Sequence, residues 1–168
     1  MKKTWVQTVQ SAERAFFTIV LSAKKRVRNR GRILPERFRS IAKIRRFLQA
    51  SMTPCLANRV IGNLDLRRIN GKLAVPIGDT IGAAPVVKSQ VLYRCGPNVT
   101  LAVWFGFDTS DQFFRVYQLR QRPNGSWIVV GRHPLDYPFS LPGQERTPLA
   151  GCCAPCKGSI RKTFLKRK

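Results

Sequence analysis

Arginine is the residue whose number and spacing in this sequence best suit a defined chemistry, the binding of phosphate. The chain of 168 residues carries 31 Lys and Arg against 8 Asp and Glu, a formal net charge of +23. Guanidinium groups bind phosphate through paired hydrogen bonds, and charge neutralisation supplies most non-specific affinity for nucleic acid. The sequence therefore predicts a nucleic-acid-binding surface made by the cations that crowd between residues 26 and 46: Arg26, Arg28, Arg30, Arg32, Arg37, Arg39, Lys43, Arg45 and Arg46.

The cations concentrate toward both ends of the sequence. Residues 1–50 contain 14 Lys and Arg against 2 acids, residues 141–168 contain 7 against 1, and residues 51–140 contain 10 against 5. There is no zinc-finger, RNP or KH signature, so we expect binding to the phosphate backbone, with RNA favoured over DNA. Trp104 could stack on an unpaired base, although packing in the core is the commoner role of a tryptophan. The middle of the chain adds cations of its own: Lys88, Arg94, Arg120 and Arg132.

Three cysteines near the C-terminus have a spacing that could supply part of a zinc site. Cys152, Cys153 and Cys156 form a CC-x-x-C cluster, but a structural zinc site needs four ligands. The fourth would have to come from a distant residue: Cys55, Cys95 or His133. We therefore predict no metal and no other cofactor and expect free thiols at these positions, with a zinc site as the alternative. An odd number of cysteines indicates a reducing compartment.

Nucleophilic catalysis would depend on His133, the sole histidine. Asp136 lies three residues further on and could orient the imidazole, but no serine-hydrolase or cysteine-protease motif accompanies the two residues. Residues 77–82 lack the lysine and the glycine spacing of a phosphate-binding loop. We predict that the protein is not an enzyme.

Two basic helices are predicted to position the arginines. Thr4 and Gln7 suit a capping box at the start of a helix over residues 4–29, and a second helix over residues 36–50 follows Pro35. The second helix places Arg45 on its apolar side, from which the guanidinium is expected to snorkel to solvent. The first helix carries a heptad seam, which predicts packing on the protein's own core or, alternatively, pairing of two copies. The seam runs through Trp5, Val9, Ala12, Phe16, Ile19, Ala23 and Val27.

From residue 64 the apolar period changes to two, which predicts strands. Asn70-Gly71 marks a tight hairpin, and further turn sequences separate the later strands. We expect a curled antiparallel meander of about six strands with the two helices packed on it, an α+β fold. This order is similar to the layouts of cystatin-like and NTF2-like domains, an analogy of topology that implies no function. The strands are expected at residues 64–69, 72–77, 86–95, 99–107, 113–121 and 126–132.

The sequence divides into a basic helical segment at 1–50, an antiparallel β domain at 51–140 and a basic tail at 141–168. Prolines punctuate the chain from residue 134 onward and predict irregular structure there. Residues 1–30 share their composition with mitochondrial targeting segments as well as with nucleic-acid-binding arms. The compartment is therefore left open among cytoplasm, nucleus and mitochondrion.

Together these patterns predict a non-enzymatic, nucleic-acid-binding structural protein of a ribonucleoprotein or a viral particle. The alternative is a peripheral membrane or protein-partner module, because the first helix joins Phe16 and Phe17 to a basic flank that suits an anionic membrane surface. The heptad seam between Trp5 and Val27 adds the prediction of a homo-oligomer.

Overall fold

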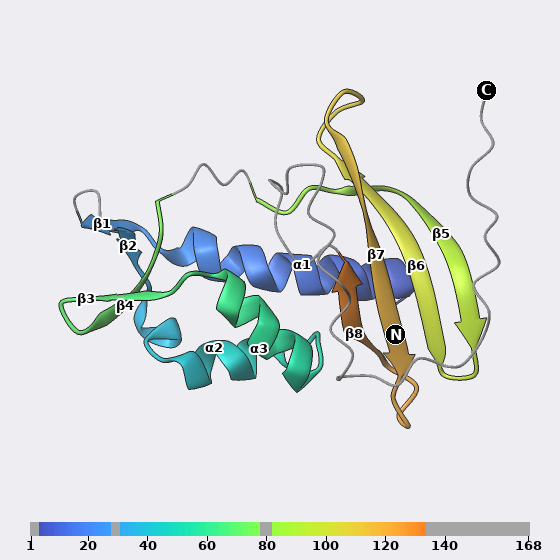
Figure 1. Cartoon of the computed structure of the whole chain (residues 1–168), viewed down its shortest axis with the longest axis horizontal. Coiled ribbons are helices and arrows are strands. Elements are labelled where there is room, and N and C mark those ends of the chain that lie inside the picture. Colours follow the sequence, from blue (N-terminus) through green and yellow to red (C-terminus); the bar gives the residue numbers. More distant parts are fainter. Residues whose placement is uncertain (1–3, 28–30, 78–81, 134–168) are drawn as a thin grey trace.

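Three α-helices and two four-stranded antiparallel sheets make up residues 4–27, 31–77 and 82–133, the part of the chain that the computed structural model describes (Figure 1). The predicted α+β class is confirmed, but the prediction of one sheet of about six strands is wrong. The expected tail at 141–168 lies outside the described residues. The helices are α1 (Trp5–Ser22), α2 (Ile41–Leu48) and α3 (Pro54–Asn63), with one 3₁₀ turn, η1 (Glu36–Phe38).

Helix α1 begins with the predicted capping box. The Gln7 amide donates to the Thr4 hydroxyl at 3.3 Å, and the Thr4 amide donates to the Gln7 side chain at 2.9 Å. The helix ends at Ser22 rather than at residue 29, because the chain turns at Ala23 into a strand that pairs with a later one. On a continued helix the cations four residues apart, such as Lys24 and Arg28, would repel one another.

The smaller sheet, which the sequence did not predict, contains four short strands. The first strand lies within the first expected helix, and the second lies in the expected break between the two helices and pairs with β4 rather than with the long strands. The Asn70-Gly71 hairpin is confirmed, with φ angles of 50° and 75° at the two turn residues. The strands are β1 (Lys25–Val27), β2 (Gly31–Ile33), β3 (Arg67–Ile69) and β4 (Lys72–Val75), in the order β1-β2-β4-β3.

The larger sheet is the predicted meander of the four longest strands. Pro76 follows β4 and Pro85 precedes the first long strand, and neither residue can donate a ladder hydrogen bond. This interruption explains why the chain forms two sheets instead of one. The strands are β5 (Val86–Cys95), β6 (Asn98–Gly106), β7 (Gln112–Gln121) and β8 (Trp127–His133), in sequence order.

The segment predicted as one helix over residues 36–50 consists of η1 followed by α2. The Ser40 hydroxyl caps α2 by accepting from the Lys43 amide at 3.3 Å. Helix α3, which the sequence analysis did not identify, follows at once with Pro54 in its first turn. The link between α2 and α3 is fixed to the edge of the larger sheet, where the Thr53 amide donates to the Val129 carbonyl at 2.9 Å.

The core lies between α1, the α2–α3 pair and the inner face of the larger sheet (Figure 1). Val9, Ala12, Ile19 and Ala23 of the heptad seam are buried there, so the seam packs within the chain. The predicted homo-oligomer itself is not tested and stays a prediction. From the sheet, β6 contributes alternate residues to the core: Val99, Leu101, Val103 and Phe105.

Candidate nucleic-acid interface

Helix α2 presents its cations to solvent together with Ile41 and Phe47, while two of its apolar residues point into the core. Ile44 and Leu48 are fully buried, whereas Lys43, Arg45 and Arg46 are exposed. Arg45 is exposed, and its guanidinium donates to the Asn58 side chain of α3 at 2.8 Å.

The hairpin of β1 and β2 brings two of the predicted arginines face to face. Arg26 lies opposite Arg32 in the antiparallel register, so both side chains leave the same face of the sheet. Like charges directly across a ladder repel, and an anion placed between them would relieve that repulsion. Arg28 and Arg30 lie outside the described residues.

Further cations join this region from segments that the sequence analysis did not single out. Arg67, Arg68 and Lys72 belong to the β3–β4 hairpin, which is held against β2 by the ladder of β4. The sequence showed that this hairpin is basic but gave no sign of which sheet it would join. We call the combined surface the basic end: Lys24, Lys25, Arg26, Arg32, Arg37, Arg39, Lys43, Arg45, Arg46, Arg59, Arg67, Arg68 and Lys72.

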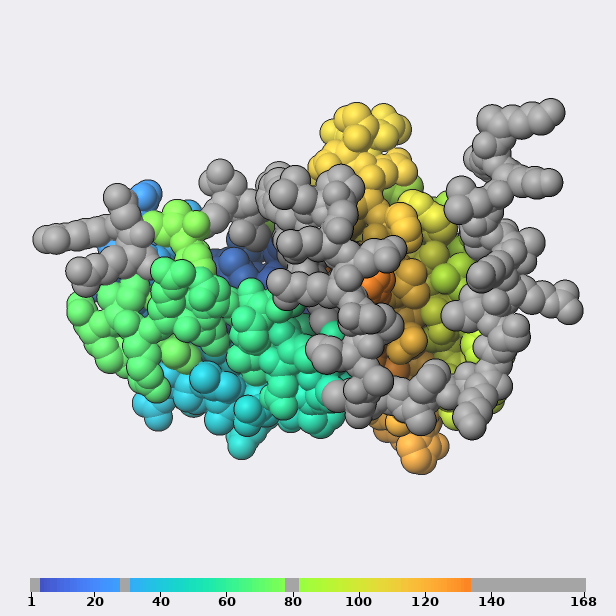
Figure 2. Space-filling model, in the orientation of Figure 1, coloured from blue at the N-terminus to red at the C-terminus, as the bar shows by residue number. Residues whose placement is uncertain are grey.

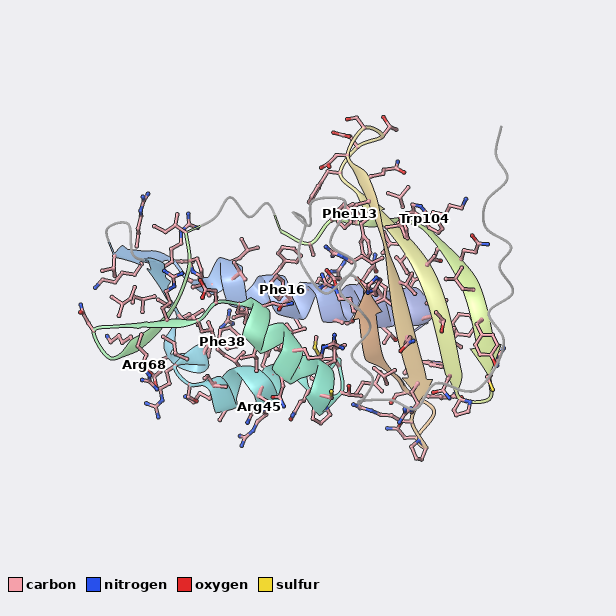
Figure 3. All side chains as sticks on the ribbon, in the orientation of Figure 1. Phe16, Phe38, Arg45, Arg68, Trp104 and Phe113 are labelled. Atoms are coloured by element: carbon pink, nitrogen blue, oxygen red, sulfur yellow. The ribbon has the colours of Figure 1, made fainter. Side chains whose placement is uncertain are left out.

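Acids are scarce around the basic end. Residues 24–27 and 31–77 contain thirteen Lys and Arg but two acids, Glu36 and Asp65. Glu36 pairs with Arg39 at 2.6 Å and Asp65 with Arg67 at 2.6 Å, and all four side chains are largely exposed. Exposed ion pairs are worth little in water, so the local field stays strongly positive. Figure 3 shows Arg68 and Arg45 in the half of the molecule away from the larger sheet, and Figure 2 shows the surface formed there by the blue-to-green segments.

Trp104 lies on the outer face of the larger sheet and is not part of the core, contrary to the favoured expectation. It is half-buried, and its ring lies 6.1 Å from that of Phe114, which is 59% exposed. The Lys88 ammonium lies 5.4 Å from the centre of the indole ring on the neighbouring strand.

The other strand cations suggested by the sequence have structural partners. The Arg94 guanidinium lies 5.7 Å from the Trp5 ring centre, and Arg120 donates to the Asn98 side chain at 3.3 Å. Arg132 is buried beside an acid on α1, so it is not available to phosphate in this conformation.

That acid, Glu13, forms the centre of a buried polar cluster on the inner face of the larger sheet. Its carboxylate accepts the Tyr117 hydroxyl at 2.7 Å and lies 2.8 Å from Arg132 Nε and 3.3 Å from an Arg115 nitrogen. The sequence analysis missed this cluster, although Glu13 is the one acid among the apolar residues of α1. The cluster joins α1 to β7 and β8.

Burial and mutual charge shift the pKa values within this cluster. Burial, aided by the charge of Arg132, holds the pKa of Arg115 below the ordinary arginine value. Burial is the largest single influence on Arg132 and opposes its charge, but Glu13 and Tyr117 together outweigh burial and raise the pKa of Arg132. Burial and the neighbouring carboxylate both raise the pKa of Tyr117, which therefore remains a protonated donor.

A small cavity beside this cluster has room for about one water molecule. It is lined mostly by apolar side chains, among them Phe16, Leu56 and Val129, and it is too small for an organic substrate. We therefore regard the cluster as a structural support.

The candidate metal and catalytic residues do not assemble into a site in the described part of the chain. His133 is exposed at the end of β8, Cys95 ends β5 and Cys55 lies in the first turn of α3. No group of three His, Cys, Asp or Glu side chains suited to a metal ion occurs among the described residues. Asp136 and the Cys152, Cys153 and Cys156 cluster lie outside them.

The membrane alternative depends on two phenylalanines of α1, and both of them pack in the core. Phe17 is buried and Phe16 is packed against the core cluster, with the two rings edge to face. Among the described residues, no helix is long and apolar enough to cross a membrane.

Neither a protein-family model nor a curated protein sequence matches this chain.

Proposed function

We propose that this protein is a non-enzymatic structural protein that binds the phosphate backbone of nucleic acid, RNA in preference to DNA, within a ribonucleoprotein or viral particle. The observation that carries the proposal is the convergence of three separate segments on the basic end. The β1–β2 hairpin, the η1–α2 segment and the β3–β4 hairpin contribute cations to one half of the described structure, with two acids among them.

Backbone binding needs a surface of this kind and no particular motif. Each phosphate that a Lys or Arg neutralises releases counterions, so the affinity falls as salt rises. Arg37, Arg45 and Arg46 extend from exposed positions on neighbouring elements, and Arg26 and Arg32 lie opposite each other on the β1–β2 hairpin.

The test is the salt dependence of binding to a labelled oligo(U) of about 15 nucleotides, measured by fluorescence anisotropy from about 50 to about 200 mM KCl. Replacing Arg37, Arg45 and Arg46 with Gln should make the slope of log affinity against log salt shallower by about 2, since each single-strand phosphate contact contributes about 0.7.

A matched control removes the same charge elsewhere. The triple variant Arg14→Gln, Arg120→Gln and Arg122→Gln leaves the basic end intact and should keep the wild-type slope. Equal flattening by both triple variants would refute a localised interface, and a wild-type protein that binds neither oligo(U) nor an RNA duplex would refute the proposed function.

The membrane alternative has less support in the structure. Its apolar anchors on α1 are committed to the core, so α1 would have to leave the larger sheet to enter a lipid surface.

A further inference from the structure

The outer face of the larger sheet carries an aromatic pair near one end of its two middle strands, in which Phe114 is exposed and Trp104 is half-buried. Trp104 on β6 and Phe114 on β7 are directly opposite in the antiparallel register, and Lys88 on β5 lies opposite Trp104 from the other side. The two rings are tilted by 34° with their centres 6.1 Å apart. Figure 3 labels Trp104 on the sheet, well away from Arg45 and Arg68.

This aromatic pair is not explained by the core. The core side chains of β6 point to the opposite face, toward α1, whereas Phe114 is 59% exposed and Trp104 is half-buried. An aromatic pair flanked by a cation suits a ligand that has both a flat face and negative charge.

The composition of the sheet agrees with an anionic ligand. The charged side chains at outer-face positions of β5 to β8 are Lys88 and Arg120, and these four strands contain no Asp or Glu. The acids nearest in sequence, Asp108 and Asp111, lie in the turn after β6, where the Asp108 carboxylate accepts from the Ser110 amide and hydroxyl, each at 2.8 Å. Gln90, opposite Ala102, occupies the next outer-face position along β5 from Lys88 and can donate to or accept from base edges.

We propose that Trp104 and Phe114 form a stacking platform for the bases of single-stranded nucleic acid, with Lys88 against the backbone. This inference rests on the proposed function and narrows its ligand to a strand with unpaired bases, because a duplex keeps the faces of its bases stacked inside. The basic end binds backbone of either form, whereas the platform distinguishes single strands from duplexes.

The experiment compares two probes, an oligo(U) of about 15 nucleotides and an RNA duplex of about 15 base pairs, at one salt concentration. Trp104→Ala should weaken oligo(U) binding by about 5- to 150-fold, the effect of losing one stacked base. Duplex affinity should stay within about twofold, and the oligo(U) salt slope should not change, because the substitution removes no charge.

Two further variants refine the comparison. Trp104→Phe keeps an aromatic face and should retain most of the oligo(U) affinity. Phe107→Ala removes a phenylalanine that is 47% exposed just beyond β6 and should have no effect on either probe. Wild-type oligo(U) binding should also quench tryptophan fluorescence, and this quenching should be lost in Trp104→Ala.

Each outcome bears on a stated idea. If the wild-type protein binds neither probe, the proposed function fails. If it binds oligo(U) with a steep salt slope and Trp104→Ala binds equally well, the stacking platform is refuted while backbone binding stands. If Trp104→Ala melts well below the wild type, Phe114→Ala is used in its place, because its exposed ring can be removed without leaving a cavity. Unchanged oligo(U) affinity in Phe114→Ala then refutes the platform.

Discussion

Removing the charge of Glu13 tests whether the buried cluster holds α1 on the larger sheet. In Glu13→Gln one side-chain oxygen remains to accept the Tyr117 hydroxyl, but the negative charge between Arg115 and Arg132 is lost. Arg115 is 2% exposed, so water cannot replace the lost carboxylate without opening the core.

The expected loss of stability follows from that burial. Removing one partner of a buried ion pair costs about 3–5 kcal/mol, because a charge is left without compensation in the interior. The retained hydrogen bond to Tyr117 favours the lower end of that range. For a chain of this size each kcal/mol lowers the melting temperature by about 2–4 °C, so we expect a drop on the order of 10 °C.

Urea unfolding followed by tryptophan fluorescence measures the free energy of unfolding directly. Glu36→Gln is the matched control, since its ion pairs are exposed and its loss should change stability by no more than about 0.5 kcal/mol. Adding Arg115→Met to Glu13→Gln should recover part of the loss by removing an uncompensated charge. A loss below about 1 kcal/mol in Glu13→Gln would show that the cluster does not support the fold in this way.

Three further substitutions and a titration follow from the geometry. The pKa of Tyr117 is higher in the folded protein than its unfolded value of about 10, so its contribution to stability is complete below about pH 10 and is lost as the pH rises further. The free energy of unfolding should therefore be smaller at about pH 11 than at about pH 9, and Tyr117→Phe should reduce this difference. Gly31→Ala should cost about 1–3 kcal/mol in thermal unfolding, because φ is 150° and a Cβ would lie 2.7 Å from the Val75 carbonyl oxygen. Gly62→Ala, on the exposed side of α3 with no atom near the new Cβ, should instead stabilise the protein by about 0.5–1 kcal/mol, and an equal melting temperature for the two alanine variants would contradict both expectations.

The long strands could be predicted from the sequence because period-two alternation and tight turns are local signals. Strands β5 to β8 lie within one residue of the expected ranges. The strand β1 could not be found in this way, because Ala23 and Val27 continue a helical period and only the pairing with β2 overrides it. Helix α3 has a weak apolar pattern, and its position depends on packing against α2 and β8.

Some residues of the candidate sites could likewise be predicted from local sequence patterns, and others could not. The concentration of arginine in residues 26–46 is visible in the sequence, whereas the contribution of the β3–β4 hairpin depends on the pairing of β2 with β4. Glu13 and Arg132 are 119 residues apart, and no local pattern joins them. The exposure of Trp104 became clear only when the inner face of β6 was known.

The long sequence separation within the Glu13 cluster also sets the order of events during synthesis. Helix α1 leaves the ribosome first, but its partners on β7 and β8 follow more than a hundred residues later. At a synthesis rate of about 5–20 residues per second, the apolar face of α1 therefore stays for about 5–20 seconds without the strands that bury it in the folded protein. We expect limited proteolysis of ribosome-bound chains of increasing length to show α1 becoming protected only after β8 has emerged, so that the nascent chain depends on chaperones or on a bound polyanion during this interval.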